Sequence, residues 1–124
     1  MTAPQTFTKT GTGPRAAEAE AAYLRWLRQG SDAVVKVYSV DVEANTLTIE
    51  EVASARPTRE AGRRAGEELA AIHAMGAEAF GAPAEGWDGP NYIGRAQQDC
   101  IPARRWAEFL SLIHISEPTR QAEI

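Results

Sequence analysis

The chain has 124 residues, of which 44% are hydrophobic and 24% are charged, and it carries a net charge of −4 at pH 7. This length and composition are typical of at most one soluble globular domain. The acidic balance argues against binding to nucleic acid or to an anionic membrane, because both need clustered Lys and Arg.

The single cysteine, Cys100, excludes a disulfide within the chain and favours a reducing compartment. No apolar stretch approaches the roughly 20 residues that a helix needs to cross a bilayer. The first ten residues lack the apolar centre of a secretory signal peptide. We therefore expect a cytoplasmic protein, and we expect it to be a monomer.

The first thirty residues predict a short strand followed by a helix. Residues 5–9 alternate in polarity as a strand does, and a stretch rich in glycine then breaks the pattern before Pro14, which suits the first turn of a helix. Residues 16–29, AAEAEAAYLRWLRQ, are strong helix formers, and Gly30 is expected to end the helix. The face expected to be apolar carries Glu20, Leu24 and Leu27.

A pair of strands comes next. Residues 33–40, AVVKVYSV, are β-branched and aromatic, and residues 46–52, TLTIEEV, have the same character. The polar stretch between them predicts a turn, so the two should form an antiparallel hairpin. Together with the strand at residues 5–9, this gives a three-stranded sheet with one helix on one face.

A second helix is predicted from Thr58, a good N-cap, to Met75, with Gly76 just past its end. Its apolar stripe holds Ala61, Ala65, Leu69 and Ile72, and the mixed charges Arg59, Glu60, Arg63, Arg64, Glu67 and Glu68 indicate a solvated face. Residues 77–105 contain many Gly and Pro residues and are predicted to be loop. Within and after that loop, Trp87 and Trp106 are expected to be packing residues, and a further helix should begin near residue 104.

Two residues carry the chemical signal. Lys9 lies at the end of the first predicted strand, and Glu20 lies on the apolar face of the next helix, where an unpaired carboxylate would be unfavourable. A strand Lys that reaches a helix Glu, followed by a hairpin, is the layout of a kinase nucleotide lobe, in which the Lys contacts phosphates and the Glu positions the Lys. From spacing alone, a surface Lys9 and a Glu20 at the edge of the buried face remain an alternative. Glu18 also competes for the role, although it lies about 200° around the helix from Glu20.

The order of several segments resembles the fructosamine kinase family, which belongs with the aminoglycoside-phosphotransferase-like kinases. The segments are FTK, EAEAAYLRWL, VVKVYSVD, LTIEEV, GEELAAIHAMGAEAFG and WDGPNYIGRAQQDCIPARRWAEF, and they span residues 7–109. The resemblance implies an α+β, incomplete protein-kinase-like fold. Residues 1–52 would form part of the nucleotide-binding lobe, and residues 53–109 would form the start of the substrate lobe.

The resemblance also implies roles for individual residues. Lys9 would contact the phosphates of ATP and Glu20 would be its helix partner, while Glu50, Glu51 and Val52 would form the hinge whose backbone faces adenine. Gln98 matches a glutamine of the substrate loop, but here Gln97 and Cys100 stand where the family has Pro and Asn. His73 falls on a helix-end histidine and is expected to pack or cap the helix. No residue is assigned to a metal.

The implied activity is ATP- and Mg²⁺-dependent phosphorylation of a sugar hydroxyl in a ketosamine, either a small molecule or a protein-bound adduct, which would serve deglycation. The chain contains no His-Gly-Asp catalytic loop, so no catalytic residue is assigned, and only eight residues precede Lys9. Residues 110–124, LSLIHISEPTRQAEI, resemble the translation of a transposase adapter used in sequencing-library preparation. We therefore expect an inactive piece of a longer enzyme that ends in a non-native tail.

Two other functions remain open at this level. One is another phosphotransferase of the same fold, acting on an aminoglycoside or on choline. The other is a small, helix-rich interaction module with no catalytic activity.

Overall fold

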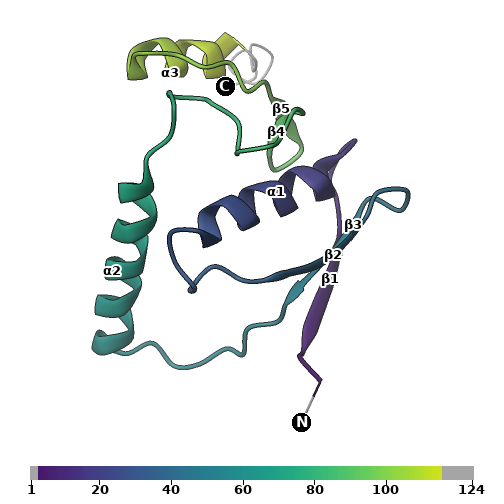
Figure 1. Cartoon of the computed structure of the whole chain (residues 1–124), viewed down its shortest axis with the longest axis vertical. Coiled ribbons are helices and arrows are strands. Elements are labelled where there is room, and N and C mark those ends of the chain that lie inside the picture. The colour runs from purple at the N-terminus through teal and green to yellow at the C-terminus, as the bar shows by residue number, and fades with distance from the viewer. Residues whose placement is uncertain (1–2, 116–124) are drawn as a thin grey trace, which may run out of the picture.

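The computed structural model describes residues 3–115, with side chains described as far as Leu112. The elements, in chain order, are β1 (Thr6–Thr10), α1 (Ala16–Arg28), β2 (Val37–Asp41), β3 (Thr46–Glu50), α2 (Arg59–Met75), β4 (Asn91–Ile93), β5 (Ala96–Gln98) and α3 (Trp106–Ile115). Figure 1 shows α1 lying along a three-stranded sheet, with α2 standing beside them and α3 beyond the small hairpin. Most of the predicted tail, residues 116–124, lies outside the described residues.

The predicted three-stranded sheet is present, and β2 and β3 form the predicted antiparallel hairpin. The strand order is β1-β3-β2, and β1 also pairs antiparallel with β3. In the β1–β3 register Lys9 lies opposite Leu47 and Thr6 lies opposite Glu50. The strand predicted at residues 33–40 begins only at Val37. Its first residues are held in a turn instead, because the Arg28 guanidinium at the end of α1 donates to the carbonyl oxygens of Asp32 (3.0 Å) and Val34.

The core between α1 and the sheet is small. Ala17 and Ala21 of α1 and Leu47 of β3 are each about 1% exposed, with Leu24, Val37, Val40 and Ile49 packed around them. The buried positions of α1 are alanines (Ala16, Ala17, Ala19 and Ala21), while the predicted face of Glu20, Leu24 and Leu27 is only half-buried. The alanines let the helix lie close to the strands on one side and to the later chain segments on the other.

The start of α1 differs from the prediction in one respect. Arg15, and not Pro14, immediately precedes the helix, and it has a left-handed backbone conformation with φ 61°. Its side chain does not cap the helix. The N–H of Ala16 donates to the carbonyl oxygen of Gly13 in the preceding loop (3.1 Å), so the next N–H of the first turn, that of Ala17, is the one that needs a partner from elsewhere in the chain.

Helix α2 has the predicted ends, and its apolar stripe is largely exposed. Thr58 accepts a hydrogen bond from the N–H of Ala61 (3.0 Å), and Gly76 follows the helix with φ 66°. No residue of α2 is buried, and Leu69 in the predicted apolar stripe is 52% exposed. The helix touches the turn after α1, where Ser31 donates to Glu68 and Ile72 lies half-buried beside Gly30. The rest of the apolar stripe, Ala61, Ala65 and Leu69, is exposed in the described part of the chain.

The predicted loop at residues 77–105 contains regular structure, so that prediction was wrong in part. β4 and β5 form a hairpin that pairs Asn91 with Gln98, and an isolated bridge joins Phe80 to Ala103. The two strands are three residues each, too short to show an alternating pattern. A two-residue turn joins them and begins at Gly94 with φ 63°, the positive φ that tight hairpins require.

Candidate functional site

Lys9 and Glu20 form an ion pair between strand β1 and helix α1. The Lys9 ammonium lies 2.9 Å from Glu20 Oε1, and the two side chains are 41% and 38% exposed. Glu18, the competing carboxylate, instead accepts a hydrogen bond from Arg15 (Nε to Oε2, 3.3 Å). The structure therefore brings together the Lys and Glu that the sequence singled out, and their role in nucleotide binding stays a prediction.

A cavity of about 380 Å³ opens beside this ion pair. One wall is the end of β1 and the loop after it, residues 9–12, and a second is the face of α1 that carries Glu20 and Tyr23. The third wall comes from the β4–β5 hairpin, through Asn91, Tyr92 and Gly94. A cation at the rim of a cavity of this size can bind a small anionic group that enters it.

The predicted hinge residues lie at the other end of the sheet from this cavity. Glu50 ends β3 opposite Thr6, three residues along β1 from Lys9, which corresponds to about 10 Å at the usual rise per strand residue. The N–H of Glu51 donates to the carbonyl oxygen of Gln5 (2.9 Å), and Val52 is 67% exposed. None of the three residues lines the cavity, and their contact with adenine stays a prediction.

Gln98 is half-buried in β5 and does not line the cavity either. Its cross-strand neighbour, Asn91, does so. A substrate role for Gln98 remains a prediction, whereas Asn91 is a cavity residue that sequence reasoning missed. The available signal was the Tyr-Ile-Gly-Arg stretch, in which a Gly-X pair joins two short segments as in a tight hairpin.

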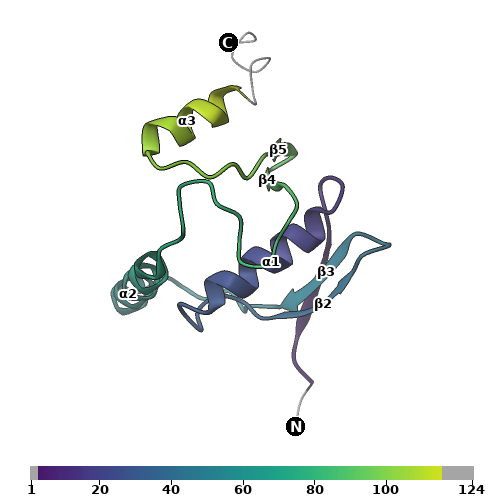
Figure 2. The same ribbon diagram turned by 45° about the horizontal axis from the view of Figure 1, so that its top comes forward.

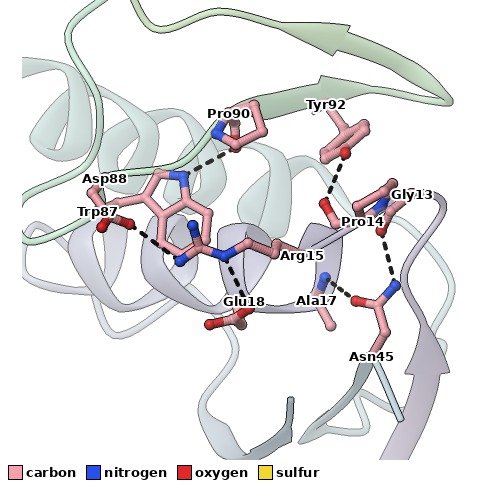
Figure 3. Close-up of polar contacts among 10 residues, drawn as sticks. All are labelled: Gly13, Pro14, Arg15, Ala17, Glu18, Asn45, Trp87, Asp88, Pro90 and Tyr92. Atoms are coloured by element: carbon pink, nitrogen blue, oxygen red, sulfur yellow. Dashed lines mark hydrogen bonds and ion pairs between the residues drawn. The ribbon is translucent and has the colours of Figure 1, made fainter. Parts of the chain in front are cut away.

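Asn45 caps helix α1 from the turn between β2 and β3. Its Oδ1 accepts the N–H of Ala17 (3.1 Å), and its Nδ2 donates to the carbonyl oxygen of Gly13 (2.8 Å), as Figure 3 shows. Asn45 has φ 54°, a conformation that Asn tolerates better than most residues. This contact supplies the cap that Arg15 does not, and it fixes the start of the helix that carries Glu20.

Farther along α1, Tyr23 contacts Cys100, with the hydroxyl 3.3 Å from the sulfur. Burial, reinforced by the hydrogen bond to Cys100, raises the pKa of the Tyr23 phenol above its ordinary value. The contact ties α1 to the chain just after β5. Cys100 is therefore a packing residue in this structure.

Other candidates lie away from the cavity. His73 is exposed at the end of α2, where its carbonyl oxygen accepts the N–H of Gly76 (3.3 Å). Trp106 is 54% exposed and contacts the rings of Phe80 and Phe109. Residues 3–115 contain no group of three His, Cys, Asp or Glu side chains placed to hold a metal ion. None of the helices in this part of the chain is long and apolar enough to span a membrane.

Comparison with solved structures finds a related protein. The chain is similar to the crystal structure of a "putative fructosamine-3-kinase" from Thermobifida fusca, with 37% sequence identity and a TM-score of 0.74. The similarity covers 87% of this chain and 37% of that chain, so this chain spans little more than a third of the length of that protein. No model of a protein family matches the chain, and no curated protein matches it.

This similarity confirms the predicted relationship to the fructosamine kinase family. The helices and the two small antiparallel sheets described above match part of a kinase-like fold. The chain is thus related to kinase-like phosphotransferases in both sequence and fold.

Proposed function

We propose that this relative of the fructosamine kinases is part of an ATP-dependent phosphotransferase that phosphorylates a sugar hydroxyl of a ketosamine. In this proposal residues 1–52 belong to the nucleotide-binding lobe, residues 53–109 begin the substrate lobe, and residues 110–124 are not native. The whole enzyme is longer than this chain, and the chain by itself is inactive. Its reaction partner is a ketosamine, either free or attached to a protein.

The Lys9–Glu20 ion pair is the observation that carries the proposal. In kinases a strand Lys contacts the nucleotide phosphates while a Glu on the next helix holds it in place. An ion pair as exposed as this one contributes little to stability, since such pairs are typically worth about 0.2–1 kcal/mol. The Lys9–Glu20 ion pair joins a strand to a helix beside a cavity but adds little to stability, so ligand binding explains it better than a structural role does.

The apolar stripe of α2 supports the assignment to a longer enzyme. Leu69 in that stripe and Phe80 and Trp106 farther along are 52%, 44% and 54% exposed. Large apolar side chains that are this exposed favour burial against another part of a larger fold. The related chain is much longer than this one, and in this proposal the remaining sequence of the enzyme covers these side chains.

The residues present fit ATP better than they fit Mg²⁺. The Lys9 ammonium offers a donor for phosphate oxygens, and the cavity gives those oxygens room. The described residues contain no acidic cluster for Mg²⁺, and we assign no ligand for that ion to this chain. The catalytic aspartate and the Mg²⁺ ligands of the proposed enzyme belong to its remaining sequence.

The test begins by reading the coding sequence of the gene across the codon for Phe109 and upstream of Lys9. The extended protein would then be assayed for ATP-dependent phosphorylation of a fructosamine, an aminoglycoside and choline. We expect phosphate transfer to the fructosamine alone. Transfer only to an aminoglycoside or choline would reassign the substrate. A native reading frame that ends after Ile124, with no nucleotide effect on the folded chain, would contradict the kinase function and favour an interaction module.

A further inference from the structure

The loop that joins Lys9 to Glu20 lies between two other parts of the chain. Residues 11–15 connect β1 to α1, and on one side they contact Asn45 in the β2–β3 turn. On the other side they contact the segment 87–98, which includes the β4–β5 hairpin (Figure 2). The relative placement of Lys9 and Glu20 therefore depends on contacts made by this short loop.

Two hydrogen bonds in opposite directions join the loop to the hairpin. The Tyr92 hydroxyl donates to the carbonyl oxygen of Pro14 (2.8 Å), and the Thr12 hydroxyl donates to the carbonyl oxygen of Gly94 (2.7 Å). The approach is close enough to require glycine at position 13, because a Cβ there would lie 2.7 Å from the Tyr92 ring. The hairpin is thus fitted against the loop.

Arg15 adds a charged contact at the first residue before α1. Its Nη2 donates to Asp88 Oδ1 (3.1 Å) and its Nε to Glu18 Oε2 (3.3 Å). The guanidinium also lies 4.6 Å over the ring of Trp87, whose Nε1 donates to the carbonyl oxygen of Pro90 (3.0 Å). Figure 3 shows Arg15 beside the Trp87 ring, with dashed lines to Asp88 and to Glu18. The segment before β4 therefore holds the N-terminal end of α1.

We propose that the segment 87–98 is a brace that positions α1 so that Glu20 reaches Lys9. Lys9 is fixed by the pairing of β1 with β3, whereas the place of Glu20 depends on the rotation and axial position of α1. A displacement of a helix by one residue moves a side chain by about 1.5 Å and turns it by about 100°, which is enough to break the ion pair. The importance of the brace for catalysis rests on the proposed function, but its effect on the ion pair does not.

The two lysines of the chain allow a direct test. Lys9 is ion-paired, whereas Lys36 is exposed and serves as an internal reference. In the full chain, without nucleotide, an amine-acylating reagent should modify Lys9 more slowly than Lys36, because the Lys9 amine is held 2.9 Å from the Glu20 carboxylate and is only partly accessible to the reagent. Glu20→Gln removes the carboxylate and therefore gives the ratio of Lys9 to Lys36 modification that is expected when the ion pair is absent. Mass spectrometry gives the ratio of Lys9 to Lys36 modification.

The test variants are Asp88→Asn and Tyr92→Phe, which remove single brace contacts. Asp32→Asn and Tyr38→Phe are matched controls, because Asp32 pairs with Arg28 at the other end of α1 and Tyr38 is an exposed strand residue. We expect the test variants to raise the ratio of Lys9 to Lys36 modification by about 1.5- to 5-fold. This range corresponds to the loss of an exposed ion pair, which is typically worth about 0.2–1 kcal/mol. The controls and the conservative Asp88→Glu should leave the ratio near that of the unchanged chain.

Three results would overturn the brace. The first is an unchanged ratio in both test variants while Glu20→Gln raises it. The second is equal modification of Lys9 and Lys36 in the unchanged chain, since the ion pair would then not form in solution. The third is a rise in Asp32→Asn as large as in Asp88→Asn, which would indicate a general loosening of α1. None of these results depends on ATP, so phosphate transfer by the extended protein remains a separate test.

Discussion

Asn45 caps a helix that begins far from it in the chain: its Oδ1 accepts the N–H of Ala17, 28 residues earlier, at 3.1 Å. The same side chain donates to the carbonyl oxygen of Gly13 (2.8 Å). One amide therefore joins the β2–β3 turn to both the loop and the first turn of α1. The core between α1 and the three-stranded sheet depends on this contact because α1 supplies one whole side of it.

Removing the Asn45 side chain should destabilise α1. Asn45→Gly keeps a residue that tolerates φ 54° while deleting both hydrogen bonds, and we expect a loss of about 1–3 kcal/mol in the free energy of unfolding, the usual net contribution of two hydrogen bonds. Asn45→Asp keeps the acceptor for the N–H of Ala17 but loses the donor to Gly13, so it should lower the free energy of unfolding by less than Asn45→Gly does. Urea unfolding followed by circular dichroism measures both. Equal stability of Asn45→Gly and the unchanged chain would show that the cap is not formed.

Replacing glycine by alanine should have opposite effects on the free energy of unfolding in two parts of the chain. A Cβ on Gly11 would lie 2.6 Å from Asn45 Oδ1 and 2.8 Å from the backbone nitrogen of Ala17, so Gly11→Ala should displace the cap and lower the free energy of unfolding by about 1–3 kcal/mol. A Cβ on Gly62 or Gly66 in α2 meets nothing within 4 Å. There alanine should stabilise the helix by about 0.5–1 kcal/mol.

The free energies of unfolding of Gly11→Ala, Gly62→Ala and Gly66→Ala, measured under identical conditions, check this contrast. The fold described here requires opposite signs for Gly11→Ala and for the α2 variants. A stabilising Gly11→Ala would mean that the loop does not approach Asn45 and Ala17 as closely as the structure has it.

Tyr23 should make the fold sensitive to alkaline pH. Burial, with a further contribution from the Cys100 hydrogen bond, raises the pKa of its phenol above the ordinary value of 10.0. The folded state thus binds the phenol proton more tightly than the unfolded state. The stabilisation is complete below pH 10 and is lost as the pH rises from there towards the higher folded-state pKa.

We expect the free energy of unfolding to fall from about pH 10 upwards in the unchanged chain and to fall less in Tyr23→Phe. Tyr38→Phe, which changes an exposed tyrosine, is the control and should keep the full decrease. The absorbance of tyrosinate gives a second measurement, because one of the three tyrosines should ionise later than an exposed phenol. Identical pH profiles for the two variants would contradict the burial of the Tyr23 hydroxyl.

The parts of the fold that the sequence predicted depend on local signals. Helix α2 has Thr58 and Gly76 at its ends because capping acts within one turn, and the strong helix formers of α1 act the same way. The β4–β5 hairpin escaped prediction because three-residue strands show no period. The exposure of the α2 stripe could not be predicted, because an apolar stripe indicates that a helix has a partner without showing whether the same chain supplies it.

The same distinction between features with and without a local sequence signal applies to the candidate site. The pairing of Lys9 with Glu20 could be expected from residue types and from resemblance, since both belong to elements that are readable in the sequence. The roles of Asn45, Arg15 and Tyr92 could not, because each acts on a segment distant in the chain through only one or two contacts. Such contacts leave no periodic or compositional signal.

The most direct test of the central claim is the rate of phosphate transfer from ATP to a fructosamine in the extended protein, with Lys9→Met compared with Lys36→Met. Methionine preserves the length of the side chain and removes the charge that would contact the phosphates. We expect Lys9→Met to lower the rate by about 10²- to 10³-fold, the usual effect of deleting one donor to a reacting oxyanion. Lys36→Met should retain the activity, and both variants should keep the circular dichroism spectrum of the folded protein. Full activity in a folded Lys9→Met protein would contradict the assignment of Lys9 to the nucleotide phosphates.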